Sequence, residues 1–257
     1  MRRFLLILAS LLLAMVMLLS WLVLSESGSR WLVARATDAV PGLSINATSG
    51  RLYDGMALQQ LAYRQHDGLA ISVERIHFAW TPHRLLERTL SVELLDVEAV
   101  ELSLPESSDT TSQTRIPEQI ALPVNVELKH LELRDLKIHQ GDQMFPVDRF
   151  MAVARLDREG LKLGSLDFAQ PDIGLKLHGS VAARYPFAVN LQTEWHASVP
   201  DQPRVNGTGS ISGSLERLNL DQRMDFAGGS RLRASVIPDL ADNQHTFELT
   251  AEWQHLD

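Results

Sequence analysis

Residues 126–138 read VELKHLELRDLKI, and this stretch decides the fold class. Apolar side chains alternate with charged ones, which is the period of a β-strand with one buried and one solvated face. Residues 92–104, VELLDVEAVELSL, have the same pattern. Both stretches contain two-residue slips that move the strand onto the next segment of a sheet. They therefore predict two long strands of one sheet.

The same period continues along the chain after Gly42. Apolar and polar residues alternate over residues 69–80, but the apolar positions shift by one residue midway. This shift predicts a bulge or bend near Glu74 and Arg75. Residues 106–119 are polar and indicate an exposed loop. Further strands are expected at Phe150–Leu156, Leu161–Phe168, Ile173–Ala182, Phe187–His196, Val205–Ser214, Leu218–Phe226, Arg231–Ile237 and Phe247–Trp253.

No second long helix is predicted, so nothing covers the apolar face of the expected sheet. Such a face must close on itself, be capped, or bend into a trough. We therefore expect a mainly β fold, an elongated antiparallel sheet curled into a trough. Alternation within residues 92–138 places the charged Glu101, Glu127, Glu132 and Lys137 on the outer face. The predicted lining of the trough is the opposite set: Val97, Val100, Leu102, Leu104, Val126, Leu128, Leu131, Leu133, Leu136 and Ile138.

The N-terminus carries a long apolar run, Phe4 to Leu24, which is interrupted by two serines and contains no charge. A helix of this length spans roughly 31 Å, the thickness of a bilayer core. Arg2 and Arg3 favour a cytoplasmic N-terminus, so the body would lie in the periplasm. A cleaved signal peptide and a buried core helix are the alternatives, although a signal core is usually about 7–15 residues long. The residues that mark the predicted transmembrane helix are Phe4, Leu12, Trp21 and Leu24.

A short helix is expected next, from Ser29 to Val40, with Ser29 as its cap and Pro41-Gly42 ending it. The chain then divides into an anchor at 1–28, this helix at 29–42 and a β-rich body at 43–257. The body ends just after a strand-like segment, so we expect the trough to continue in a longer protein.

Composition excludes several classes of protein. The chain has 257 residues, no cysteine, 24 basic and 32 acidic residues, and a net charge of −8. Without cysteine it cannot be a disulfide scaffold, a thiol enzyme or an iron–sulfur protein, and the absence suits an oxidising periplasm. The acidic body repels phosphodiester backbones, which argues against nucleic-acid binding.

Motifs that carry chemistry are missing. The nine histidines lack metal-ligand spacing, and residues 207–213, GTGSISG, miss both the dinucleotide fingerprint and the nucleophile elbow. The acidic run from Glu93 to Glu101 is typical of a solvated strand face rather than an acid–base pair. We predict no catalytic residue, no cofactor and no metal, and hence no enzyme. An exported enzyme with an unseen site remains an alternative.

Several short motifs, in order, resemble the N-terminal part of the TamB family. They are GRLYDGMAL at 50–58, IHFAWTPHRLL at 76–86, VEAVELSLP at 97–105, YPF at 185–187 and GTGSISGSL at 207–215. The family is the inner-membrane subunit of the translocation and assembly module, related to AsmA-like bridge proteins. Its members are far longer and end in a C-terminal domain that this sequence lacks.

The resemblance implies a β-taco trough that carries phospholipid acyl chains across the periplasm. It also implies an inner-membrane location and an outer-membrane barrel partner, TamA, reached through the C-terminal region absent here. Lipid conduction and assistance to protein assembly are both compatible with it. The alternative function is a closed-core structural β-solenoid, anchored in the membrane, that transfers no lipid.

Overall fold

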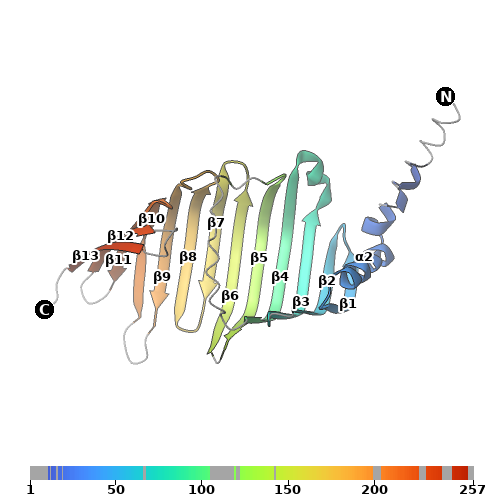
Figure 1. The fold of residues 1–257 in the computed structure, drawn as a ribbon, viewed down its shortest axis with the longest axis horizontal. Helices are drawn as coiled ribbons and strands as arrows, with labels where there is room; N and C mark the ends of the chain where they lie inside the picture. Colours follow the sequence, from blue (N-terminus) through green and yellow to red (C-terminus); the bar gives the residue numbers. More distant parts are fainter. Residues whose placement is uncertain are drawn as a thin grey trace.

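The computed structural model describes residues 11, 13–15, 17–18, 20–65, 68–104, 119, 122–141, 143–198, 204–225, 230–238 and 245–253. Within these ranges thirteen strands form one sheet, and their spatial order follows the chain from β1 to β13 (Figure 1). Among the described strands β1 and β13 are the two ends of the row and do not pair, so the sheet is open. The predicted mainly β fold is confirmed.

The predicted strands all overlap observed ones, and a 3₁₀ turn, η1, joins β3 to β4. The bounds are α2 Glu26–Ala39, β1 Leu43–Arg51, β2 Gly55–Arg64, β3 Ala70–Thr81, η1 Pro82–Glu87, β4 Thr89–Leu104, β5 Asn125–Gln140, β6 Gln143–Leu156, β7 Gly160–Ala169, β8 Ile173–Ala182, β9 Val189–Ala197, β10 Val205–Ser214, β11 Arg217–Asp225, β12 Ser230–Pro238 and β13 His245–Trp253.

One strand pair departs from the predicted antiparallel sheet. β4 and β5 run parallel, with Leu90 opposite Val126 and Leu102 opposite Ile138. Apolar and charged residues alternate in the same way in parallel and antiparallel strands, so the sequence pattern could not reveal the parallel pairing. A parallel pair needs a crossover of about a dozen residues or more, which the long segment between β4 and β5 supplies. Of the loop predicted at 106–119 only Gln119 is described, and it forms an isolated bridge with Arg184.

The short helix α2 differs from its predicted form at the cap. α2 begins at Glu26, and Ser25 caps it by accepting a hydrogen bond from the Gly28 N–H at 2.9 Å. Ser29 is instead fully buried inside the helix. Its hydroxyl oxygen accepts the Leu52 N–H at 2.8 Å, which fastens the start of α2 to the β1–β2 turn.

The apolar run that precedes α2 is only partly described. Phe4 and Leu12 lie outside the described residues, while Trp21 and Leu24 are helical and exposed. Among the residues that are described, no helix combines the length and the hydropathy needed to cross a bilayer. The transmembrane helix therefore stays a prediction.

A crease crosses strands β1 to β6. It consists of six residues that lie opposite one another but are skipped by the ladder of paired residues: Asn46, Gln60, Glu74, Ala99, Asp135 and Asp148. Gln60, Ala99 and Asp135 have φ near +50°, outside the extended region. One extra residue per strand bends the strand yet returns its apolar side chains to the same face. The bend predicted near Glu74 is thus one part of a line that runs across six strands.

Candidate functional site: the apolar face of the sheet

The strand register builds one continuous apolar face. Each strand from β2 to β9 contributes one residue to a row of directly opposed partners. That row is Leu58, Ile76, Val97, Leu133, Phe150, Phe168, Leu175 and Trp195. A parallel row beside it is Met56, Phe78, Leu95, Leu131, Ala152, Leu166 and Leu177. A linear hydrocarbon could lie along these rows, across the strands.

All ten residues predicted to line the trough lie on β4 and β5 and share this face. Val97 faces Leu133, Val100 faces Leu136, and Leu102 faces Ile138. Sequence reasoning missed three further members, Leu90, Val92 and Leu95, which face Val126, Leu128 and Leu131. Leu104 completes the set opposite Gln140. Their shared face follows from the register, whereas contact with lipid stays a prediction.

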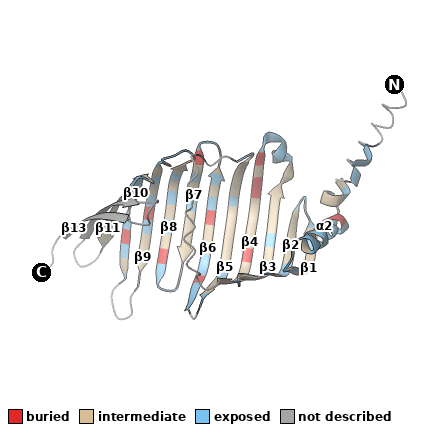
Figure 2. Ribbon diagram, viewed as in Figure 1, coloured by how far each residue is buried: buried red, intermediate tan, exposed pale blue. Residues whose placement is uncertain are grey.

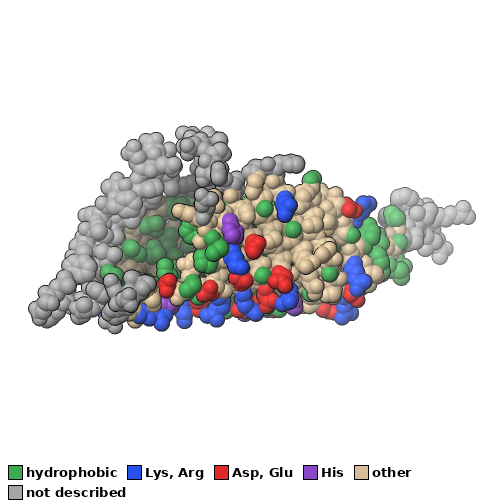
Figure 3. Space-filling model, turned by 90° about the horizontal axis from the view of Figure 1, so that it is seen from below, with side chains coloured by type: hydrophobic (Ala, Val, Ile, Leu, Met, Phe, Trp, Pro, Cys, Tyr) green, Lys and Arg blue, Asp and Glu red, His purple; other side chains and the backbone are tan. Residues whose placement is uncertain are grey.

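Most of this face is only partly covered (Figure 2). The buried hydrophobic residues among the described ones are Val73, Val92, Val97, Val147, Ala152, Ala183 and Phe187. A sheet packed against a second layer would bury nearly every apolar side chain of the contacting face. In Figure 3 hydrophobic side chains line a recess beside the charged margin of the molecule. The apolar rows therefore border open space along much of the sheet.

The opposite face is charged, and Arg134 on β5 is its centre. Its guanidinium lies 3.1 Å from an Asp96 carboxylate oxygen, 3.0 Å from Glu98 and 3.0 Å from Glu132. Asp96 and Glu132 are direct cross-strand partners, so without Arg134 two like charges would face each other. The Arg134 hydrogen bond lowers the pKa of Glu132, and Glu132 in turn raises the pKa of Arg134.

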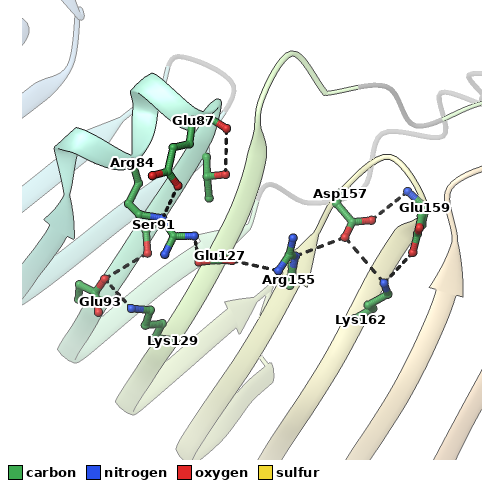
Figure 4. Close-up of polar contacts among 11 residues, drawn as sticks. Arg84, Glu87, Ser91, Glu93, Glu127, Lys129, Arg155, Asp157, Glu159 and Lys162 are labelled. Carbon is green, nitrogen blue, oxygen red and sulfur yellow. Dashed lines mark hydrogen bonds and ion pairs between the residues drawn. The ribbon is translucent and has the colours of Figure 1, made fainter.

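A second polar cluster, around Glu93, connects β3, β4 and β5 near the start of β4; Figure 4 shows its contacts with Ser91 and Lys129. One carboxylate oxygen of Glu93 accepts hydrogen bonds from Lys129 at 2.8 Å, Thr81 at 2.6 Å and Ser91 at 3.1 Å. These donors, Lys129 foremost, lower the pKa of Glu93 to about 2. Glu93, a member of the acidic run, thus connects neighbouring strands on the charged face through hydrogen bonds.

Ion pairs continue from there along the turn-rich end of the strands (Figure 4). Glu127 lies 3.2 Å from Arg155, which also approaches Asp157 at 3.3 Å. Lys162 pairs with Glu159 at 2.7 Å, and this contact raises the pKa of Lys162. The Glu159 backbone N–H donates to Asp157 and lowers the pKa of that carboxyl. The chain of charges links β5, β6 and β7.

The apolar face changes character at β9 to β11, a feature that the sequence analysis missed. Thr193 and Gln222 occupy apolar-face positions, are about 5% exposed each, and hydrogen-bond through the hydroxyl and the amide at 2.8 Å. The Trp195 indole N–H donates to the Gln222 carbonyl at 3.0 Å. On β10, Gly207 lies opposite Trp195, and Gly209 lies opposite both Thr193 and Gln222; their missing side chains leave room for the indole and the amide.

Among the residues that the structure describes, no group of three or more histidine, aspartate or glutamate side chains could hold a metal ion. The arrangement that remains is a long apolar face with a salt-bridged back. Such an arrangement can bind and guide an apolar chain.

Comparison with known proteins gives the family. The family model described as the TamB N-terminal domain matches residues 15–177 and, in an overlapping segment, residues 107–257. No curated protein and no solved structure matches the chain. The two matched segments together cover nearly the whole sequence, and the resemblance found in the short motifs is confirmed. The chain belongs to the family of the TamB N-terminal domain.

Proposed function

We propose that this chain conducts phospholipid acyl chains along the apolar face of its open sheet. One observation carries the proposal: the apolar rows run without interruption from β2 to β8, yet most of their side chains are only half-buried. An acyl chain laid along the rows would cover that surface. Each buried methylene contributes about 0.8 kcal/mol, so even a partly covered chain would bind.

Family membership supports the wider setting of the proposal. A TamB-like chain would be anchored in the inner membrane by its N-terminal run, with the sheet in the periplasm. It would act in the translocation and assembly module, together with the outer-membrane barrel TamA. In this setting the chain delivers lipid to the outer membrane or assists protein assembly there, and it carries no catalytic step.

The competing function, a closed structural solenoid, needs side chains that meet across the interior. The linear strand order and the half-exposed rows do not favour it. A photoreactive residue tests the two directly when placed at Leu136 on the apolar face and, as matched control, at Lys137 on the charged face. In membranes, Leu136 should crosslink to phospholipid and Lys137 should not. Absence of lipid at Leu136, or equal yields at both positions, contradicts the proposal.

A further inference from the structure

Two helical segments meet at a break beside the first strands of the sheet. The chain is helical up to Leu24, is extended at Ser25 with a ψ of 145°, and then enters α2. The two segments lie close together there: the Ser29 hydroxyl donates to the Leu22 carbonyl oxygen at 3.4 Å. A Cβ at Gly28 would overlap the Leu22 backbone, so this close approach requires glycine.

The β1–β2 turn is hydrogen-bonded to both helical segments. The Tyr53 N–H donates to the Val23 carbonyl of the first segment at 3.1 Å, and the Leu52 N–H donates to the Ser29 hydroxyl of α2 at 2.8 Å. The indole N–H of Trp80, on β3, donates to the Leu52 carbonyl at 2.5 Å. We call this meeting point the N-terminal joint; it consists of residues 21–29, 52–53 and 80. In Figure 1 the first helical segment leaves the sheet here.

The apolar face of the sheet starts at the N-terminal joint. Trp80 lies on that face opposite Val92, and its ring stacks on Phe78 with 6.4 Å between the centroids. Met56 begins one of the apolar rows and follows Tyr53 by three residues, which is about 10 Å of extended chain. The hydrogen bonds of the joint therefore fix where the first apolar rows lie relative to the helical segment.

Large apolar side chains before and around the joint are exposed. Those among the described residues 11–53 that are at least 40% exposed are Leu11, Leu13, Met15, Met17, Leu18, Trp21, Leu24, Trp31, Val40 and Tyr53. From Leu11 to Leu18 they point to all sides of the helix, because successive residues are about 100° apart. A protein partner covers one side of a helix, whereas lipid covers every side. Figure 3 shows hydrophobic side chains gathered at this end, on its right.

Three of the exposed side chains at this end are aromatic. Trp21 belongs to the joint, Tyr53 forms its turn, and Trp31 follows Ser29 by two residues on α2. Tryptophan and tyrosine are enriched at the level of lipid headgroups, where the ring meets both apolar and polar groups. The Arg35 guanidinium lies 5.8 Å from the centre of the Trp31 ring. A long cationic side chain at this position can reach lipid phosphates.

The charge of this end allows it to approach an anionic surface. Residues 20–55 contain three arginines and three acidic residues, so they are neutral overall, whereas the whole chain carries −8. Two of the arginines are paired internally: Arg30 lies 2.5 Å from Glu26, and Arg51 pairs with Asp54. An anionic bilayer repels the acidic remainder of the chain but not this end.

We infer that the N-terminal joint seats this end of the sheet on a lipid bilayer, with Trp21, Trp31 and Tyr53 at the level of the headgroups. The helical segment before Ser25 then enters the lipid, and the exposed side of α2 lies against the headgroups. Ser29 is a positioning residue, because its hydroxyl joins α2 to the turn from which the apolar rows start. The inference rests on the membrane setting of the proposed function, but not on the conduction of lipid.

Spin labels test the contact with the bilayer, because the chain has no cysteine of its own. Ala34→Cys places a label on the exposed side of α2, one turn from Trp31, and Gln192→Cys places the control label on an exposed position of β9. The full chain is placed in nanodiscs of phosphatidylethanolamine and phosphatidylglycerol. Oxygen concentrates in lipid, whereas a nickel chelate stays in water. The ratio of oxygen to chelate collisions should be several-fold higher at Ala34→Cys, and equal ratios would overturn the inference.

A pair of labels tests the positioning role of Ser29. Met17→Cys and Gln59→Cys report the distance between the first helical segment and β2, which should be narrowly distributed. Ser29→Ala removes the acceptor of the Leu52 N–H, and it should broaden this distribution and lower the collision ratio at Ala34→Cys. Thr37→Val is the control, because the Thr37 hydroxyl bonds only to the Val33 carbonyl within α2. Circular dichroism checks that both variants fold, and an unchanged distribution in Ser29→Ala would refute the positioning role.

These outcomes are separate from those of the proposed function. If the Ala34→Cys label meets lipid but a photoreactive residue at Leu136 captures none, only the conduction of lipid fails. If Leu136 captures lipid but the Ala34→Cys and Gln192→Cys labels give equal ratios, only the inference about the joint is overturned. Shielding of the Ala34→Cys label from both oxygen and the chelate would indicate a protein contact, such as a second copy of the chain, and would also overturn it.

Discussion

The central strands β3 to β6 and the later strands β9 to β11 stabilise the same sheet in different ways. In the centre, large aliphatic residues fill the apolar face and a network around Arg134 holds the charged face. At β9 to β11, glycines leave the apolar face bare, and Trp195 and Gln222 lie over it. The centre tolerates open space beside large side chains, whereas the later strands depend on a close fit.

The largest predicted effect is the loss of stability on substituting a buried side chain, compared with the same substitution on the open apolar face. Phe187, in the β8–β9 connection, is 4% exposed. Phe187→Asp should lower the free energy of unfolding by about 4 kcal/mol, because it buries an unpaired charge and removes a large apolar group. Leu133→Asp should cost only about 2 kcal/mol, because its carboxylate can reach water beside the open rows. Urea unfolding measures both values, and equal losses would mean that the apolar face is a closed core.

A methyl group tests the close fit of the later strands. A Cβ at Gly209 would overlap the Asp221 carbonyl oxygen and the Gln222 amide. Gly209→Ala should therefore cost about 3 kcal/mol and disturb the Trp195 environment. Gly164→Ala in β7 is the control, since its Cβ would meet Val153 at an ordinary 3.4 Å and should cost under about 1 kcal/mol. Thermal unfolding followed by tryptophan fluorescence measures the stability of both variants. If Gly209→Ala is as stable as the unsubstituted protein, the tight packing is refuted.

Removing the central cation should have a smaller effect. Arg134→Gln leaves Asp96, Glu98 and Glu132 clustered, with Arg75 alone still paired to Glu98. Because the side chains are partly exposed, the loss of stability should be small and should shrink in high salt. Lys176→Gln is the control, since its contact with Asp167 is long, at 3.9 Å. Denaturant unfolding at low and high salt measures the difference, and a salt-independent loss would contradict an electrostatic origin.

The smallest effect depends on pH through Glu93. Its folded pKa, about 2, lies below the ordinary 4.5, so the ionised form is favoured by folding. This stabilisation is present above pH 4.5 and is lost as the pH falls towards 2. Glu93→Gln should be less stable by about 1 kcal/mol at pH 7, a value reduced for solvent screening. The difference should vanish near pH 2, and a difference independent of pH would exclude the carboxylate as its cause.

Alternation predicted the strands and which apolar residues of β4 and β5 share one face, because both depend only on local sequence. The slip between Val73 and Ile76 likewise predicted a bend, although its extension to Gln60 and Asp148 needs the register of six strands. The parallel orientation of the β4–β5 pair leaves no trace in the strand patterns, because alternation is the same in parallel and antiparallel strands. The Trp195–Gln222 contact joins two strands separated by the glycines of β10, and no local pattern marks it.

Lipid bound to the purified chain tests the central claim most directly. Mass spectrometry of organic extracts should find phospholipid with the unsubstituted protein and much less with Leu133→Asp, because an acyl chain cannot cheaply desolvate the new carboxylate. Circular dichroism should show that the variant keeps its β-sheet. Phospholipid absent from the unsubstituted protein, or retained in full by folded Leu133→Asp, would contradict the claim that the apolar face carries acyl chains.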